Sequence, residues 1–318
     1  MDDRNRKNDE VVQALVVANA TVDETYSVKE LPAIGESSVG QLRARDVGGK
    51  GANVATVLAR CGLGTALVAV IGDDARGNYI KNELMQETIV LDLVQSTQCS
   101  TDISLINVDV HGHNTIVTTV EAAHSLEALH ARQALERLPE NGFLILQGNL
   151  TQALTRLLVS DAKKRGLTVV LNPSPLLPWM SSIVTLVDIV FVNEMEASCI
   201  TGKNSEAAVT AMLCKGPSQV VLTRGAESAL LGTRYDNAEA TDQIHIESVP
   251  SINTDAVDTT GAGDTYLAVA MASAARRCVA LDVLALTHAA QAAAHTISFH
   301  GARSAFPTGT ELAAILVS

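Results

Sequence analysis

The sequence predicts an α/β protein with a mostly parallel central sheet, helices on both faces of the sheet and a small β part outside it. Short runs rich in β-branched residues alternate with helical segments along the chain, as in strand–helix–strand units. The chain has 318 residues, 47% of them hydrophobic, so it can bury a substantial core. Two stretches of alternating polar and apolar residues break the pattern and predict hairpins outside the main sheet.

Six short apolar runs are the candidate core strands, at residues 11–18, 66–71, 142–147, 168–171, 189–192 and 219–222. Six helices separate and follow them, at residues 51–60, 78–86, 152–165, 205–214, 262–276 and 281–297. The last two helices are rich in alanine and carry few polar residues, so both should be buried on more than one side.

The two hairpins pair residues 24–31 with 37–45 and residues 101–110 with 114–120. Ordinary edge hairpins explain this alternation as well as a separate lid does. Residues 1–10 are almost entirely charged or amide side chains and predict a disordered tail. We therefore expect one domain over residues 11–318, with strands outside the main sheet at about 24–45 and 101–120.

Composition argues against several classes of function. The formal charge is −12, from 23 basic and 35 acidic residues, which disfavours binding to a nucleic-acid backbone. No apolar stretch approaches the roughly 20 residues that cross a bilayer, and the first residues lack the apolar core of a signal peptide. Five scattered cysteines without a Cys-x-x-Cys pair are typical of reduced thiols. We expect a cytoplasmic protein that binds neither nucleic acid nor membrane.

A glycine-rich turn with the sequence Asp-Thr-Thr-Gly-Ala-Gly-Asp, residues 258–264, opens directly into a predicted helix. Gly261, Ala262 and Gly263 let the backbone approach a ligand closely, and the first N–H groups of the helix would face an anion. Asp264 lies in the first helical turn, where a carboxylate is stabilised as an anion and can accept a proton from a hydroxyl. The turn suits phosphoryl transfer, although an isolated Gly-x-Gly-Asp is more often an acidic helix cap.

A second glycine cluster, Gly-Gly-Lys-Gly-Ala-Asn at residues 48–53, also precedes an apolar helical run. It lacks the spacing of a Walker A loop, so that motif does not place Lys50 on a β-phosphate. The cluster does combine exposed backbone N–H groups with Lys50 and Asn53, whose side chains can bind vicinal hydroxyls. A flexible turn with a surface lysine explains it equally well.

Together the two clusters resemble the signature segments of the ribokinase family, also called PfkB carbohydrate kinases, in the same order and separation. The resemblance runs from about Val12 to Pro307. It includes six further segments in family order: Gly35-Glu36, Gly72-Asp73-Asp74-x-x-Gly77, Asn172-Pro173-x-Pro175, Asn193-Glu194-x-Glu196, Thr223-x-Gly225 and Gly301-Ala302. It implies a ribokinase-like fold and an ATP-dependent kinase that phosphorylates a hydroxyl of a small sugar, with Mg²⁺ as cofactor. In the family, strands equivalent to residues 24–45 and 101–120 form a small β lid over the sugar. Such lids often pair between subunits, so a homodimer is also implied.

The resemblance gives each candidate residue a role. Asp264 matches the catalytic base, and the turn before it matches the anion hole, which comprises Gly261, Ala262 and Gly263. The sugar-binding positions are matched by Asp23, Gly49, Lys50 and Asn53.

The nucleotide and cation positions are matched by residues later in the chain. Asn193 and Glu196 match the pair near the nucleotide phosphates and magnesium, although their spacing alone is more often a helix cap. The nucleotide loop is matched by Thr223 and Gly225, with Gly263 facing the same nucleotide. A monovalent cation, for which K⁺ is the candidate, is implied at three matching positions, Asp258, Thr260 and Gly301.

Four positions depart from the family pattern. Ser228 replaces a second glycine of the nucleotide loop, and Ala290 or Gln291 replaces the usual Asn or His near the adenine. Ala305 replaces a serine ligand of potassium in ribokinase, which puts K⁺ activation in doubt. Asn149 replaces a glutamate that contacts ribose, and an amide both donates and accepts whereas a carboxylate only accepts. Ribose is therefore one candidate substrate among others.

Three alternatives stay open: a nucleoside kinase, a sugar-phosphate kinase of the same fold, and a catalytically idle sugar-binding regulatory protein. No extra basic cluster near the sugar motifs would hold a substrate phosphate, and aromatic residues make up only 3% of the chain, few for stacking a nucleobase. The presence of Asp264 after the Gly-Ala-Gly turn disfavours the binding protein, which would not need a base aimed at a hydroxyl.

Overall fold

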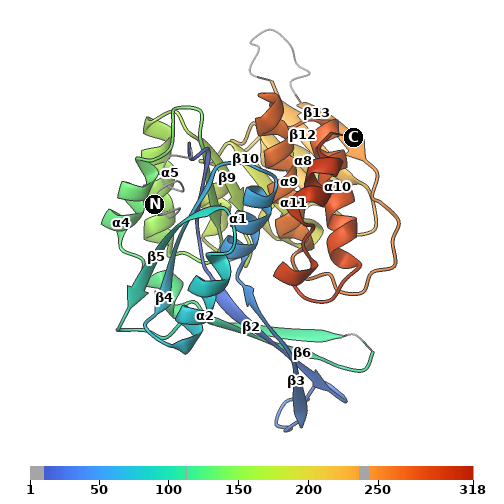
Figure 1. Cartoon of the computed structure of the whole chain (residues 1–318). Coiled ribbons are helices and arrows are strands. Elements are labelled where there is room, and N and C mark those ends of the chain that lie inside the picture. The colour runs from blue at the N-terminus through green and yellow to red at the C-terminus, as the bar shows by residue number, and fades with distance from the viewer. Residues whose placement is uncertain (1–10, 112, 236–243, 318) are drawn as a thin grey trace.

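The computed structural model describes residues 11–111, 113–235 and 244–317, so the predicted tail at residues 1–10 lies outside the described residues. Helices cover both faces of a large sheet, and a smaller sheet extends away from this body (Figure 1). The predicted fold class is confirmed.

The large sheet has nine strands in the order β13-β12-β11-β10-β9-β8-β1-β4-β5. Neighbours are parallel from β11 to β5, whereas β12 and β13 are antiparallel. The strands are β1 (Ala14–Val17), β4 (Thr65–Gly72), β5 (Ile89–Ser96), β8 (Phe143–Gln147), β9 (Thr168–Asn172), β10 (Ile189–Asn193), β11 (Gln219–Thr223), β12 (Ala229–Arg234) and β13 (Ile244–Val249).

The sequence did not predict β5, β12 or β13. A glycine inside β12 obscured that strand in the sequence. The glycine occupies this position for a steric reason. A Cβ at Gly232 would lie 2.3 Å from Val209 Cγ1, so helix α8 (Ser205–Leu213) packs directly on the strand backbone.

The core consists of two apolar layers, one on each face of the large sheet. Alternate strand residues enter opposite layers: Val16 lies in one layer, and Leu15 and Val17 lie in the other. The first layer contains residues of α1 (Lys50–Arg60), α2 (Ala75–Leu84), α9 (Ala262–Arg277), α10 (Val283–Ile297) and α11 (Gly309–Ile315). The second contains residues of α3 (Glu121–His124), α4 (Ala128–Leu135), α5 (Gln152–Lys164), α6 (Met180–Val184), α7 (Glu194–Thr201) and α8.

Helix α9, which carries Asp264 in its first turn, is largely embedded in the core. Residues 264–274 are all buried, as predicted from the alanine-rich sequence. Helix α10 is less enclosed than predicted, because Val283 and Leu284 at its start are exposed. The buried α9 holds its first turn in a fixed place relative to the sheet.

The smaller sheet contains both predicted hairpins. It has the order β3-β2-β6-β7, with strands β2 (Thr21–Val28), β3 (Gly40–Gly48), β6 (Ile103–Val108) and β7 (Asn114–Thr118). Strand β2 pairs in parallel with β6, and this pairing joins the two hairpins into one sheet that sequence reasoning did not predict.

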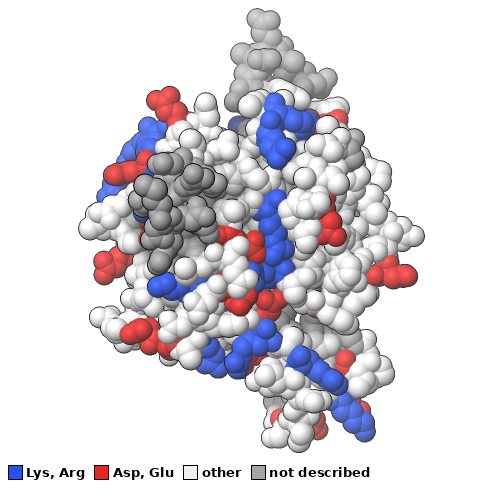
Figure 2. Space-filling view, in the orientation of Figure 1, with Lys and Arg blue, Asp and Glu red and all other residues white. Residues whose placement is uncertain are grey.

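Surface and thiol chemistry agree with the composition. Basic side chains on the visible face are interspersed with acidic ones (Figure 2). The five cysteines are free thiols. Among the described residues, no helix is long and apolar enough to cross a membrane.

Candidate active site

The two glycine clusters meet at Asp264. Asn53 Nδ2 donates a 2.9 Å hydrogen bond to Asp264 Oδ2, across 211 residues of sequence. Lys50 Nζ lies 3.6 Å from Asp264 Oδ1. The Asp264 and Asn53 residues are 4% and 5% exposed, so a carboxylate, an amide and a half-buried ammonium converge at a mostly enclosed point.

Glycines place helix α1 against the end of strand β1. Gly49 precedes the helix with a φ of 86°, a conformation that favours glycine. A Cβ at Gly51 would lie 2.6 Å from both Ala18 Cβ and Asn19 O, so only glycine permits this approach. The first turn of α1, with Lys50 and Asn53, is thereby held next to the segment between β1 and β2.

The anion-hole turn is built in a similar way. Gly261 adopts a φ of 76° directly before α9, and a Cβ there would lie 2.5 Å from the Phe306 ring. Gly263 faces open space, because a Cβ on this residue would have nothing within 4 Å. The first N–H groups of a helix lack intrahelical partners, so this turn can receive an anion beside Asp264.

Replacement of Gly261 by Ala is expected to lower kcat by at least about tenfold, because the new methyl group meets both an unfavourable φ and the Phe306 ring. Steady-state kinetics, with thermal unfolding to separate local from global damage, measure this. Gly166→Ala is the matched control, since Gly166 has a φ of 70° with nothing within 4 Å. Equal effects of the two changes on kcat would contradict the anion-hole geometry.

Asp23 lies on β2, one of the two central strands of the smaller sheet. It accepts a 2.7 Å bond from Thr21 Oγ1 and sits opposite Asp46 and Ser104 on the neighbouring strands. Burial is the main cause that raises the pKa of Asp23, hydrogen bonds from Thr21 and Ser104 lower it, and the charges of Asp46 and Asp264 raise it further. An environment this unfavourable to a buried carboxylate is typical of a binding site.

Asn149 follows strand β8 and is 3% exposed, and its Oδ1 has no hydrogen-bond partner among the described residues. The same holds for both amide atoms of Gln147, which is fully buried at the end of β8. An unsatisfied buried polar group costs about 1–3 kcal/mol, so these amides are suited to a bound polar molecule. Gln147 was missed from the sequence, where the signal was a single amide ending an apolar strand.

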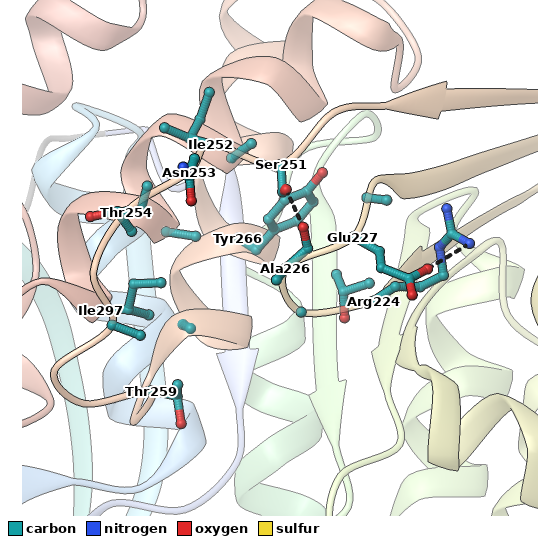
Figure 3. Close-up of a pocket in the computed structure, with 18 of the residues that line it drawn as sticks. Arg224, Ala226, Glu227, Ser251, Ile252, Asn253, Thr254, Thr259, Tyr266 and Ile297 are labelled. Atoms are coloured by element: carbon teal, nitrogen blue, oxygen red, sulfur yellow. Dashed lines mark hydrogen bonds and ion pairs between the residues drawn. The ribbon is translucent and has the colours of Figure 1, made fainter.

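A cavity of about 570 Å³ lies on the other side of the anion-hole turn. Its lining includes Thr223, Gly225 and Gly263, together with Ala290, whereas Gln291 is not among the lining residues. Figure 3 shows the loop with Ala226 and Glu227 facing the loop with Ser251 to Thr254, joined by a bond from Ser251 to the Ala226 carbonyl. The lining of this cavity is mostly apolar, which suits the base of a nucleotide.

Ser228 does not line this cavity. Its φ is not positive, so the loop turns there without the glycine conformation of the family pattern. Arg224 fixes the turn instead, with Nε bonded to Ser228 O at 2.6 Å and Nη2 to Ser228 Oγ at 2.7 Å. The arginine, which the sequence did not single out, takes over the positioning of this loop.

Asn193 and Glu196 form a capping box at the start of α7. Glu196 N donates to Asn193 Oδ1 at 2.8 Å, and Asn193 N donates to Glu196 Oε2 at 3.0 Å. The motif therefore forms a helix cap, as its spacing alone indicates. Asn193 also lies beside Thr223 in register, so the cap adjoins the cavity, and its oxygen atoms are of the type that Mg²⁺ prefers.

Asp258 joins the two segments predicted to hold a monovalent cation. Its Oδ1 accepts from Thr260 N at 2.9 Å, and its Oδ2 accepts from Gly301 N at 3.0 Å. Ala305 is buried and offers only a methyl group, whereas Ser304 Oγ lies 3.5 Å from His300 O. Within the described ranges, no group of three His, Cys, Asp or Glu side chains could hold a metal ion.

Comparisons with known proteins agree with this geometry. The model of the pfkB family carbohydrate kinases matches residues 15–309. Ribokinase from Haemophilus influenzae is 30% identical over 303 residues, which cover 93% of this chain and 95% of that protein. Ribokinase from Giardia lamblia superposes with a TM-score of 0.85 at 22% identity, covering 97% of this chain and 99% of that one.

Ribokinase from Arabidopsis thaliana, solved in complex with ribose and ATP, superposes with a TM-score of 0.81 at 23% identity, covering 96% of this chain and 99% of that one. The family match spans nearly the whole described chain and includes both glycine clusters. The chain therefore belongs to the pfkB family of carbohydrate kinases, as its sequence predicts, and is an ATP-dependent sugar kinase with the ribokinase-like fold.

Proposed function

We propose that the protein transfers the γ-phosphoryl group of ATP to a hydroxyl of a small sugar, with Asp264 as the general base. The observation that carries this proposal is the convergence of Lys50, Asn53 and Asp264, which puts a base beside polar groups suited to a sugar and beside the open turn of α9. A binding protein gains nothing from a carboxylate held at the mouth of an anion-binding turn.

In the proposed reaction, the sugar hydroxyl lies between Asp264 and the γ-phosphorus. Asp264 accepts the hydroxyl proton as the sugar oxygen bonds to phosphorus and the bond from phosphorus to the β–γ bridging oxygen breaks, which releases ADP. The N–H groups at Gly261 to Gly263 stabilise charge on the transferring oxygens, and the Lys50 ammonium adds a positive charge nearby. Asn53 orients Asp264 through its 2.9 Å bond.

The nucleotide occupies the cavity lined by Thr223 and Gly225 in this proposal. Asn193 and Glu196 would hold Mg²⁺ through its water ligands, since the capping box engages Asn193 Oδ1 and Glu196 Oε2. When bound, the magnesium ion neutralises charge on the phosphates.

On the sugar side, Asp23, Gly49, Lys50, Asn53 and Asn149 are the proposed contacts. The amide at Asn149 can donate as well as accept, so the site need not select the same hydroxyl pattern as a site with a carboxylate there. Ribose, which the Arabidopsis enzyme binds, is the first candidate substrate.

A substrate panel tests this function directly. Purified protein with ATP and Mg²⁺ is assayed against pentoses, hexoses, nucleosides and sugar phosphates while ADP release is followed. We expect turnover on a free pentose or hexose. Turnover confined to nucleosides or sugar phosphates would overturn the proposed substrate class, and no turnover on any of them would overturn the activity.

We also propose a weak monovalent-cation site at Asp258, Thr260 and Gly301. Its support is the pair of backbone bonds to Asp258, which hold the two segments together beside the anion hole. Because Ala305 offers no side-chain ligand, K⁺ activation should need concentrations about 5- to 100-fold above those of a site with all its ligands. A K⁺ titration in Na⁺-free buffer measures it. Saturation at low millimolar K⁺ would contradict the weakening, and a flat response would contradict the site.

The smaller sheet is the proposed lid and the proposed homodimer contact. Its outer strands β3 and β7 have mostly exposed residues, and the exposed side chains include Leu42, Ile116 and Val117. Open strand edges with apolar residues favour pairing with a second copy. Sedimentation of the purified protein reports this state, and a monomer at micromolar concentration would argue against it.

A further inference from the structure

Asp46 connects the proposed lid to the turn that precedes the anion hole. It lies on β3 directly opposite Asp23 in the β2–β3 register. Its Oδ1 accepts from Val47 N at 2.8 Å, which orients the carboxylate, and its Oδ2 accepts from Ser304 N at 3.1 Å. Asp46 therefore belongs to the strand next to a proposed sugar ligand, and its side chain bonds the segment at residues 301–306.

The segment at residues 301–306 contacts the anion hole in two ways. Gly301 N donates to Asp258 Oδ2 at 3.0 Å, and the other oxygen of Asp258 holds Thr260 N, immediately before Gly261. Phe306 packs so closely on Gly261 that a Cβ on that glycine would lie 2.5 Å from the ring. A displacement of this segment would therefore move Gly261 and Thr260 together.

The same segment is fixed to the body of the protein by Arg303. Its guanidinium bonds Glu83 Oε2 at 2.8 Å and lies 3.1 Å from Glu87 Oε1. Among the described residues, the bond from Ser304 N to Asp46 Oδ2 is a direct hydrogen bond between β3 and this segment.

We propose that Asp46 is a positioning residue that couples sugar binding under the lid to the geometry of the anion hole. The inference rests on the proposed function, in which Asp23 binds the sugar and Gly261 to Gly263 receive the phosphate. In this coupling, bound sugar draws β2 and β3 over the site and thereby fixes the position of the Asp46 carboxylate. The bond from Ser304 N to Asp46 then fixes the 301–306 segment. This segment in turn holds Gly261 in place. Coupling of this kind appears as tighter nucleotide binding in the presence of sugar.

Calorimetry on the full chain tests the coupling. The dissociation constant of the Mg²⁺ complex of the β,γ-imido analogue of ATP is measured with and without a saturating concentration of the panel sugar that has the highest kcat/KM. In the unchanged protein, the sugar should tighten nucleotide binding by at least about fivefold. Asp46→Ala should reduce this factor to less than about twofold and lower kcat by about tenfold, while nucleotide affinity without sugar stays within about threefold.

Two further variants separate positioning from damage to the fold. Asp46→Asn keeps one acceptor oxygen, which can serve Ser304 N only if the bond from Val47 N is lost, and should retain part of the coupling. Glu311→Ala is the matched control, because Glu311 also accepts a backbone N–H, from Thr308 at 2.7 Å, but lies on α11 outside the lid and the site. It should leave the coupling factor unchanged.

The outcomes distinguish this inference from the function on which it rests. If the unchanged protein phosphorylates a sugar and Asp46→Ala keeps the full coupling factor, the role of Asp46 is wrong and the kinase assignment stands. The same conclusion follows if the unchanged protein shows no coupling, or if Glu311→Ala loses as much coupling as Asp46→Ala. Failure of the unchanged protein to turn over any sugar would instead contradict the proposed function.

Discussion

Asp264→Asn should lower kcat by at least about 100-fold, with sugar and ATP binding within a few-fold of the unchanged protein. The amide retains an oxygen that can accept the hydrogen bond from Asn53 but cannot take the proton of the attacking hydroxyl. The loss therefore falls on the transition state and leaves the bound complex largely as it was. Steady-state kinetics together with calorimetric binding of sugar and nucleotide measure both quantities.

A matched control for this change is Asp282→Asn. Asp282 is also a carboxylate at a helix N-terminus, where it caps α10 by accepting from Ala285 N at 2.8 Å, but it lies outside the candidate site. Asparagine is a good N-cap, so kcat should stay within about twofold. Near-normal kcat in Asp264→Asn, or an equal loss in both variants, would remove Asp264 from the role of base.

Asp23→Ala should raise KM for the sugar by about 10- to 100-fold and KM for ATP by less than about threefold. The reason is its place: Asp23 lies on the lid side of the site, in a row with Asp46 and Ser104, and the nucleotide cavity is lined by other segments. Initial rates with each substrate varied in turn measure the two constants. A larger rise for ATP than for the sugar would show that the sugar is misplaced.

The stability of Asp23→Asn as a function of pH gives an independent check of this environment. Because burial raises the pKa of Asp23 above its ordinary value of 3.8, Asp23 holds its proton to higher pH in the folded protein than in the unfolded chain. The contribution of Asp23 to stability is therefore lost as pH increases from about 3.8 through the raised pKa. The neutral variant should be more stable than the unchanged protein at pH 7 and equal to it below about pH 3.8. A variant that is less stable than the unchanged protein at pH 7 would contradict a raised pKa at Asp23.

The sequence singles out the residues at the centre of the candidate site because its information there is local. Glycines at 49 and 261 indicate unusual φ angles, and glycine at 51 indicates a close backbone approach. Each of these glycines lies within three residues of Lys50, Asn53 or Asp264. The contact between Asn53 and Asp264 could be expected only through the family resemblance, because neither segment indicates by itself that it packs against a residue 211 positions away.

Features that depend on distant pairs were not predicted. The parallel pairing of β2 with β6 joins two hairpins that each look complete on their own. Arg224 replaces the structural role of a glycine at position 228 through side-chain bonds that no propensity describes. The choice between Ala290 and Gln291 at the cavity required the rotation of α10 relative to the sheet, which depends on tertiary packing.

A crystal structure with the preferred sugar and the β,γ-imido analogue of ATP tests the proposed mechanism most directly. We expect one sugar hydroxyl about 2.6–3.2 Å from an oxygen of Asp264, on the side that faces the γ-phosphate, with that phosphate at the N–H groups of residues 261–263. A sugar bound away from Asp264, or a γ-phosphate bound away from the first turn of α9, would contradict the mechanism.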